Sequence, residues 1–376
     1  MQLLNFMSPT PAEQPILNSN RDRYFPIRTV RRGAQAYPLP QARQPLDQAA
    51  LGVDAFMAEH RVGGLLVLKR GEIRLERYGL GLDERTRWYS YSIGKSVMST
   101  LLGAAIHQGA IGGVSDPVTR YLPELTGTAY DGNTIRHLLE MSSGVQWDEA
   151  YRNGTSDFGR YYNAVLEGRH DDVMAVMRGL KRAVAPGTRF VYSSGESYLL
   201  GALIAAATGQ TLSDYLSERI WARFGMEADG YWTLDGRDGL EMGSGGCNFT
   251  LRDFGRFGLF ILGGGIAGGE AILPAGWIAE ASHPQADSPQ VGYGRVAPQV
   301  PMGYGYQWWS FPSGDPRLPG HDGAFTGQGI FGQFLYLNPR EELAVVVWSC
   351  WPDPWMEEKE WATYRFLSRC VEALRN

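Results

Sequence analysis

Hydrophobic and polar positions follow different patterns at the ends of the chain and in its middle. Near the beginning, residues 46–60 repeat apolar positions at the spacing of an α-helix. Residues 63–69 and 72–78 then have the composition of strands, and the Arg70-Gly71 pair between them is typical of a tight turn. This part of the sequence therefore predicts a helix followed by a β-hairpin.

Strand patterns return near the end of the chain. Runs rich in β-branched and aromatic residues predict strands at 305–310, 329–337 and 343–349, and a turn sequence at 338–342 joins the last two. An amphipathic pattern over about 355–374 predicts a final helix.

The middle of the chain is dominated by helical periodicity, and its clearest predicted helices span 92–108, 196–208, 211–224 and 250–263. Strands at both ends around a helical middle predict an α+β fold, in which the two ends build one antiparallel sheet and a mostly helical lobe is inserted. We expect residues 1–91 and 284–376 to form the sheet domain and residues 92–283 the helical domain, with the active site between them.

Composition narrows the functional classes. The 376 residues carry a formal net charge of −5, whereas a nucleic-acid-binding protein would usually be basic. No window approaches the ~18 apolar residues of a transmembrane helix, and the beginning lacks a signal-peptide pattern, so we expect a cytoplasmic protein without a membrane partner.

The cysteines and histidines show no metal-site spacing and no phosphate loop occurs, so no metal or other cofactor is expected. Both a monomer and a homodimer fit the sequence.

Lysine is rare, since only four of the 35 basic residues are lysines. One of them, Lys95, stands three residues after Ser92 at the start of an apolar helix, so the two Cβ atoms share one face at about 5–6 Å. Burial at the positive end of a helix lowers the pKa of an amine, and a neutral amine beside a hydroxyl is a general base. The spacing predicts a nucleophile and its base. The alternative is a solvent-facing Lys95 with Ser92 as the helix N-cap.

A second candidate is Tyr192, in a loop just before the predicted helix 196–208. Neighbouring cations or hydrogen-bond donors would lower the pKa of its phenol from about 10, and Tyr192 would then relay a proton. The alternative is an ordinary half-buried aromatic side chain.

Together these segments resemble the serine β-lactamase and DD-peptidase superfamily. The resemblance rests on Ser92-Ile93-Gly94-Lys95, Tyr192-Ser193-Ser194 and a late glycine-rich strand, in this order. Residues 138–147 and 251–258 are typical of its class C branch, and the run 327–336 is most similar to 6-aminohexanoate-dimer hydrolases and related carboxylesterases. The resemblance covers most of the chain and implies an antiparallel sheet of five or more strands flanked by helices.

The resemblance also implies a mechanism. Ser92 would be acylated, and Lys95 and Tyr192 would exchange the proton that activates Ser92 and then protonates the leaving group. The implied reaction is the hydrolysis of a small carboxylic ester or linear amide, with that small molecule as the partner.

Further residues would complete the site by the same resemblance. The backbone N–H groups of Ser92 and Ile330 would form the oxyanion hole, and Ser194 and Gly329 would contact the substrate. The segment Gly320-His321-Asp322-Gly323 is a second candidate for the strand that lines the oxyanion hole.

Two departures from the pattern bear on the activity. β-Lactamases and peptidases carry Lys-Thr-Gly on the late strand, whereas no lysine here precedes Thr-Gly, and Ser194 stands where class C enzymes usually have asparagine. Both count against a β-lactamase or a penicillin-binding-protein-like peptidase. These stay open as alternatives, as does a non-catalytic binding protein on the same fold.

An acidic loop after Trp147 contains Asp148, Glu149 and Asp157. These carboxylates would select a substrate that carries an ammonium group. The alternative is a solvated loop without a binding role.

Overall fold

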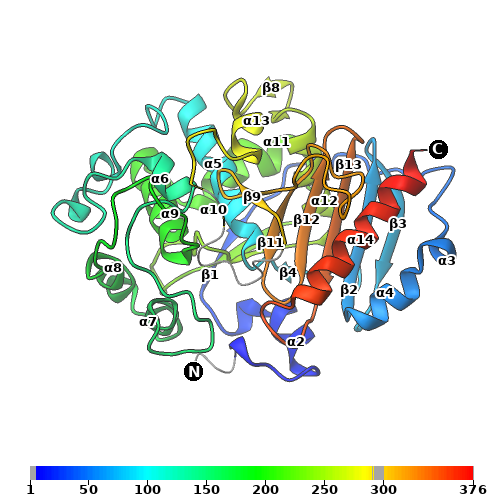
Figure 1. Cartoon of the computed structure of the whole chain (residues 1–376), viewed down its shortest axis with the longest axis horizontal. Helices are drawn as coiled ribbons and strands as arrows, with labels where there is room; N and C mark the ends of the chain where they lie inside the picture. The colour runs from blue at the N-terminus through cyan, green and yellow to red at the C-terminus, as the bar shows by residue number, and fades with distance from the viewer. Residues whose placement is uncertain (1–5, 290, 292–299, 376) are drawn as a thin grey trace.

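A seven-stranded antiparallel sheet, in the order β3-β2-β13-β12-β11-β10-β9, forms the centre of the molecule (Figure 1). The computed structural model describes residues 6–289, 291 and 300–375. The predicted hairpin forms β2 (Val62–Lys69) and β3 (Glu72–Tyr78), and β13 (Leu343–Ser349) pairs with β2, so the two ends of the chain meet inside one sheet. The prediction of an α+β fold with five or more antiparallel strands is confirmed.

One predicted late strand is in fact two. The expected strand 329–337 consists of the end of β11 (Phe325–Gly329) and most of β12 (Gln333–Asn338), joined by a three-residue turn. Phe331 and Gly332 have left-handed φ values of 64° and 84°, which reverse the chain inside an uninterrupted apolar run.

The expected strand 305–310 also contains a reversal. It lies between β9 (Gly303–Tyr304) and β10 (Trp309–Ser310), which pair with each other, and Gln307 in the turn has a φ of 63°. The aromatic run that suggested one strand therefore contains the turn of a hairpin followed by β10. Each of the two paired strands is only two residues long.

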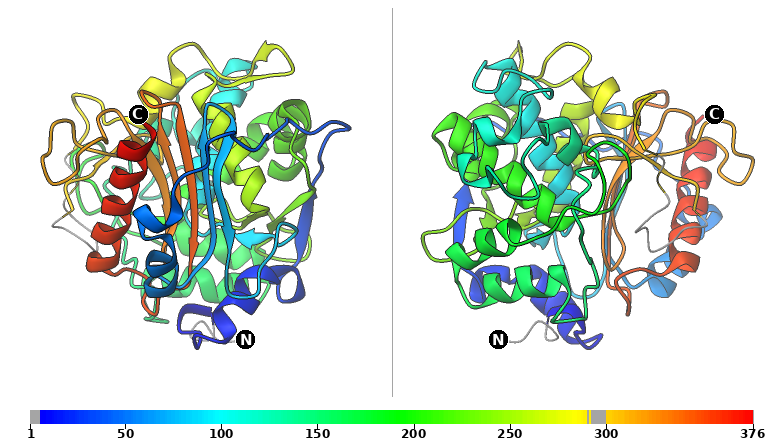
Figure 2. Two further views of the ribbon diagram at one scale, coloured as in Figure 1. Left: turned by 90° about the vertical axis from the view of Figure 1, so that its right-hand side faces the viewer. Right: turned by 60° about the vertical axis from the view of Figure 1, so that its left-hand side comes forward.

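Helices lie on both faces of the large sheet (Figure 2), and alternate residues of β13 pack in two separate cores. Val345 and Val347 pack in the same core as α14 (Glu357–Leu374) and α4 (Val53–Glu59). The intervening residues of β13 pack instead in the core that contains α12 (Leu251–Leu262). Because both faces are covered, the sheet is a rigid support for the segments at its edge.

The helix α5 (Ile93–His107) is the element that links this sheet to the helical part of the chain. It packs against β11 on one side and against α9 (Ser194–Thr208) on the other. Further α-helices are α2 (Glu13–Ser19), α3 (Gln48–Leu51), α6 (Ile135–Leu139), α7 (Asp157–Leu166), α8 (His170–Arg178), α10 (Leu212–Leu216), α11 (Ala222–Phe224) and α13 (Trp277–Ser282). None of the helices in the described parts of the chain combines the length and apolar composition that a membrane crossing needs.

A second, four-stranded sheet has the order β1-β5-β6-β4. It joins β1 (Ile27–Val30) and β4 (Trp88–Tyr89) from the early part of the chain to β5 (Gly230–Thr233) and β6 (Cys247–Phe249) from its middle. The chain leaves β4 directly into the segment that begins α5. The division into a sheet domain and a helical domain at residues 91 and 284 stays a prediction.

Candidate active site

The segment between β4 and α5 places Ser92 at the N-terminus of the apolar helix α5. Ser92 occupies the N-cap position of α5, yet its side chain makes no capping hydrogen bond and stays partly exposed. Tyr91, immediately before it, has a left-handed φ of 46°, which is uncommon for a tyrosine. The Ser92 hydroxyl is therefore left available to other groups.

Lys95 lies one turn into α5 and is buried, with only 1% of its surface exposed. Its Nζ donates hydrogen bonds to Ser92 Oγ at 3.0 Å, to Ser194 Oγ at 3.1 Å and to the carbonyl oxygen of Ser244 at 2.8 Å. Burial lowers the pKa of the Lys95 amine to about 8, although the negative charge of Glu149 opposes this effect. The predicted direction of the shift is confirmed, and a solvent-facing Lys95 is excluded.

The contact to Ser244 depends on two glycines. A Cβ atom on Gly94 would lie 2.8 Å from Gly245 Cα, a distance that no side chain tolerates without movement of the backbone. The glycine at the third position of Ser92-Ile93-Gly94-Lys95 thus permits the loop that contains Ser244 to approach the helix.

Tyr192 lies just before α9 with its ring stacked on Trp309 at a centroid distance of 5.8 Å. The Ser92 side chain interacts with its phenol in the direction that lowers the Tyr192 pKa, and Lys95 Nζ lies 5.1 Å from the centre of the Tyr192 ring. The prediction of a lowered phenol pKa is wrong, because burial, with a smaller effect from Glu149, raises the pKa of Tyr192. Tyr192 therefore keeps its proton near neutral pH.

Gly329, at the end of β11, lies against the backbone of the Ser92 segment. A Cβ atom at this position would stand 2.8 Å from Tyr91 Cβ and 3.1 Å from the Ser92 nitrogen. The alternative segment contains His321, which is buried and hydrogen-bonded to Tyr336 and Ser368 near α14. Of the two late segments, only the one containing Gly329 and Ile330 is seen in contact with Ser92.

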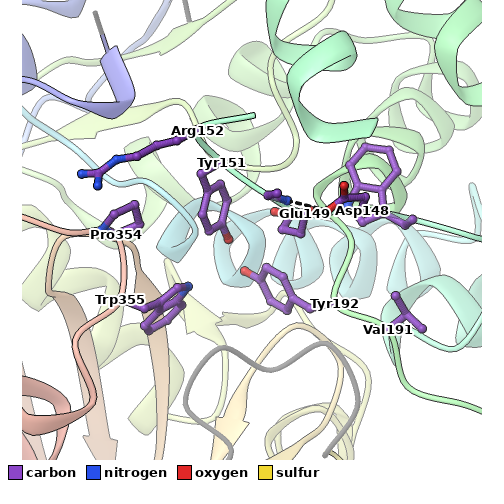
Figure 3. A pocket seen from close by; sticks show the side chains of 10 residues that line it. Asp148, Glu149, Tyr151, Arg152, Val191, Tyr192, Pro354 and Trp355 are labelled. Carbon is purple, nitrogen blue, oxygen red and sulfur yellow. Dashed lines mark hydrogen bonds between the residues drawn. The ribbon is translucent and has the colours of Figure 1, made fainter. Parts of the chain in front are cut away.

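A pocket of about 500 Å³ opens beside Tyr192 (Figure 3). It is lined by Trp147, Asp148, Glu149, Ala150, Tyr151, Arg152, Val191, Tyr192, Pro354 and Trp355. The hydroxyl groups of Tyr151 and Tyr192 point toward each other in Figure 3, and Trp355 lies beneath Tyr151. The pocket therefore combines mainly apolar walls with two phenol groups and with the charged side chains of Asp148, Glu149 and Arg152.

Glu149 connects this pocket to the catalytic candidates. Its carboxylate accepts hydrogen bonds from the backbone N–H and the hydroxyl of Ser194 and from Trp147 Nε1. Burial raises the pKa of the Glu149 carboxyl, and Lys95 partly counteracts this rise. With its oxygens already occupied, Glu149 orients Ser194 rather than standing free for an incoming ammonium group.

The other two acidic residues of the loop have structural contacts. Asp157 accepts a hydrogen bond from the Asp148 backbone and pairs with Arg160, and Asp148 accepts from the backbone of Ala150. The carboxylates of Asp148 and Asp157 thus make contacts within their own segment, and the selection of an ammonium group by this loop stays a prediction.

Three features of the site were missing from the sequence-based prediction. They are the Ser244 carbonyl, the link from Glu149 to Ser194, and the hydroxyl of Tyr151. Each depends on a contact between distant segments, so no local pattern identifies it. The Gly-Ser-Gly-Gly run at 243–246 is the only local signal, since glycines are typical of a close backbone approach.

Comparison with known proteins places the chain in a family. Residues 52–368 match the Beta-lactamase family. The 6-aminohexanoate-dimer hydrolase of Paenarthrobacter ureafaciens is 30% identical over 342 residues, covering 89% of this chain and 82% of the relative.

Solved structures share the fold at lower identity. One from Bacillus anthracis, provisionally named a 6-aminohexanoate-dimer hydrolase, has a TM-score of 0.83 at 22% identity and covers all of this chain and 97% of its own. A family VIII carboxylesterase has a TM-score of 0.64 at 18% identity, covering 88% of this chain and 99% of its own. From the matched residues and the 30% identical relative, the chain is a hydrolase that belongs to the beta-lactamase family.

Proposed function

We propose that the protein cleaves a small carboxylic ester or linear amide through an acyl-enzyme on Ser92. The observation that carries this proposal is the 3.0 Å hydrogen bond from the buried Lys95 amine to the Ser92 hydroxyl. A lysine whose pKa is near 8 supplies a neutral amine at moderate pH, and this amine can take the proton of a serine.

Acylation then follows from the contacts. Lys95 accepts the Ser92 proton while Ser92 Oγ bonds to the substrate carbonyl carbon. Tyr192, a neutral phenol beside Ser92, gives its proton to the leaving oxygen or nitrogen as that bond breaks, and Lys95 returns a proton to Tyr192. In deacylation a water molecule loses its proton to the same pair, its oxygen adds to the acyl carbon, and Ser92 regains its proton as the carboxylic acid leaves.

The negative charge that develops on the carbonyl oxygen requires donors. The backbone N–H groups of Ser92 and Ile330 are our candidates, because Gly329 holds the end of β11 against the Ser92 nitrogen. Donors of this type typically contribute about 3–4 kcal/mol each to the transition state. Ser194 and Gly329 would contact the bound substrate, and the hydrogen bonds from Ser194 to Glu149 fix the orientation of its hydroxyl.

The substrate class is limited by the pocket and by β11. The pocket walls are mainly apolar, and β11 reads Phe-Thr-Gly-Gln-Gly, without a cation to grip the carboxylate of a β-lactam. This favours a small ester or a linear amide over a β-lactam or a peptidoglycan peptide, and the 6-aminohexanoate dimer named for the Paenarthrobacter relative is the linear amide to test. The presence of Ser92, Lys95 and Tyr192 in mutual contact favours an enzyme over a non-catalytic binding protein.

A panel of substrates tests the proposal. We expect turnover of p-nitrophenyl acetate and butyrate, labelling by a fluorophosphonate probe, and no efficient turnover of nitrocefin. The absence of both ester turnover and labelling would favour the binding protein, and efficient nitrocefin hydrolysis would favour the β-lactamase. The linear 6-aminohexanoate dimer in the same panel measures the preference for amides.

A further inference from the structure

Arg21 is an unusual buried cation next to the nucleophile segment. It lies in the short 3-10 helix Arg21–Arg23 and has no exposed surface. Its guanidinium carbon lies 4.1 Å from the ring centre of Tyr89, 4.9 Å from that of Phe6 and 5.6 Å from that of Tyr91. The cation is therefore surrounded by aromatic faces, which attract it through their quadrupoles.

No carboxylate compensates this charge among residues 6–289, 291 and 300–375. Arg21 Nη2 donates to the hydroxyl of Tyr91 at 3.2 Å and to Asn18 Oδ1 at 3.4 Å, and the Tyr91 hydroxyl donates to Asn18 Oδ1 at 2.7 Å. The Nε and Nη1 atoms of Arg21 have no hydrogen-bond partner within those described residues. Burial of a cation without an anion is costly, so a contact that only filled space would be better made by an apolar side chain.

The residue that Arg21 holds is the one that shapes the nucleophile segment. Tyr91 precedes Ser92, and its left-handed φ of 46° is a conformation that costs about 1–3 kcal/mol and needs support from the surrounding structure. On its other side Tyr91 touches Gly329, the residue before Ile330. Tyr91 is thus fixed between Arg21 and the end of β11.

We propose that Arg21 is a positioning residue for the reaction at Ser92. By anchoring the Tyr91 hydroxyl together with Asn18, it holds the backbone turn that sets the direction of the Ser92 hydroxyl and N–H. This inference rests on the proposed function of Ser92. The pocket walls come from residues 147–152, 191–192 and 354–355, so loss of Arg21 affects the reaction step more than substrate binding.

Four variants test this role. Arg21→Met removes the charge and the hydrogen bonds, Arg21→Lys keeps the charge, and Tyr91→Phe removes only the anchored hydroxyl. Arg23→Met changes an exposed arginine of the same short helix and is the matched control. The measurements are kcat and KM for p-nitrophenyl butyrate, circular dichroism, and hydrogen exchange of a peptide covering residues 89–95.

We expect Arg21→Met to lower kcat about 10- to 100-fold with KM within about threefold, because small displacements of a reacting group cost rate rather than affinity. Arg21→Lys should restore part of kcat, Tyr91→Phe should resemble Arg21→Met, and Arg23→Met should match the wild type. Exchange in residues 89–95 should rise in Arg21→Met and Tyr91→Phe only. A folded Arg21→Met protein with wild-type kcat and exchange would overturn the inference.

If Arg21→Met does not fold, the positioning role of Arg21 is tested with Arg21→Lys and Tyr91→Phe instead. Wild-type kcat and wild-type hydrogen exchange in both of these variants would overturn the inference. If the wild type itself shows no turnover or labelling, the proposed function fails. The exchange measurement then still decides whether Arg21 fixes the Tyr91 segment.

Discussion

Gly329 lies so close to Ser92 that a methyl group on its Cα would stand 3.1 Å from the Ser92 nitrogen and 2.8 Å from Tyr91 Cβ. This contact places the end of β11 directly beside the start of α5, where the proposed oxyanion hole requires two backbone N–H groups to converge.

Replacement of Gly329 by alanine should lower kcat for p-nitrophenyl butyrate about 100-fold, because the new methyl group separates the Ser92 and Ile330 N–H groups. Gly113→Ala is the control, since a Cβ at Gly113 meets nothing within 4 Å. Both variants should be compared by steady-state kinetics and thermal unfolding. A folded Gly329→Ala enzyme with the kcat of Gly113→Ala would contradict this placement of the oxyanion hole.

Lys95 should be required as a base and not as a positive charge. Lys95→Arg keeps the cation but cannot lose its proton at any accessible pH, and Lys95→Ala removes the group. Both should reduce the rate of Ser92 labelling by a fluorophosphonate about 100- to 10,000-fold, the usual contribution of a general base. Lys69→Arg, at the surface end of β2, serves as a control for lysine replacement. Rapid labelling of a folded Lys95→Arg protein would remove Lys95 from the mechanism.

Activity should increase with pH through the pKa of Lys95. Burial lowers this pKa to about 8, and the neutral amine is the active form, so about a tenth of the enzyme is active at pH 7 and about nine tenths at pH 9. The pH dependence of kcat/KM for an ester substrate gives the pKa of Lys95 in the free enzyme. Tyr192, whose pKa is raised, keeps its proton over the same range. A kcat/KM that is flat or falls between pH 7 and 9 would be inconsistent with a neutral Lys95 base.

Glu149→Gln should shift that pH profile to lower pH. The negative charge of Glu149 raises the pKa of Lys95, so its removal should lower the pKa below about 8. The same change puts an amide donor against the donors of Ser194 and Trp147, which should also reduce kcat. Asp148→Asn, an exposed neighbour on the same loop, should leave the midpoint of the profile unchanged. Equal midpoints in Glu149→Gln and the wild type would show that the two groups are not coupled.

The sequence predicts those parts of the site that depend on local geometry. Ser92 and Lys95 are three residues apart on one helix, and helical spacing alone brings them together. The strand and helix boundaries were also predictable wherever composition changed at the boundary, as at the hairpin of β2 and β3.

Contacts between distant segments were not predictable. The turn at Phe331 and Gly332 interrupts a continuous apolar run, so composition gives no sign of it, and the run reads as one strand. Lys95 is hydrogen-bonded to the Ser244 carbonyl, 149 positions later in the chain, and Arg21 is hydrogen-bonded to Tyr91, 70 positions later. The raised pKa of Tyr192 likewise results from burial and from the negative charge of Glu149, which only the packed structure reveals.

Peptide mapping after reaction with a fluorophosphonate or a slowly deacylating ester locates the proposed acyl-enzyme on Ser92. We expect one adduct per chain, found by mass spectrometry on the peptide that contains Ser92, and no adduct in a folded Ser92→Ala protein. Ester turnover with the adduct on another residue, or undiminished labelling of Ser92→Ala, would contradict it.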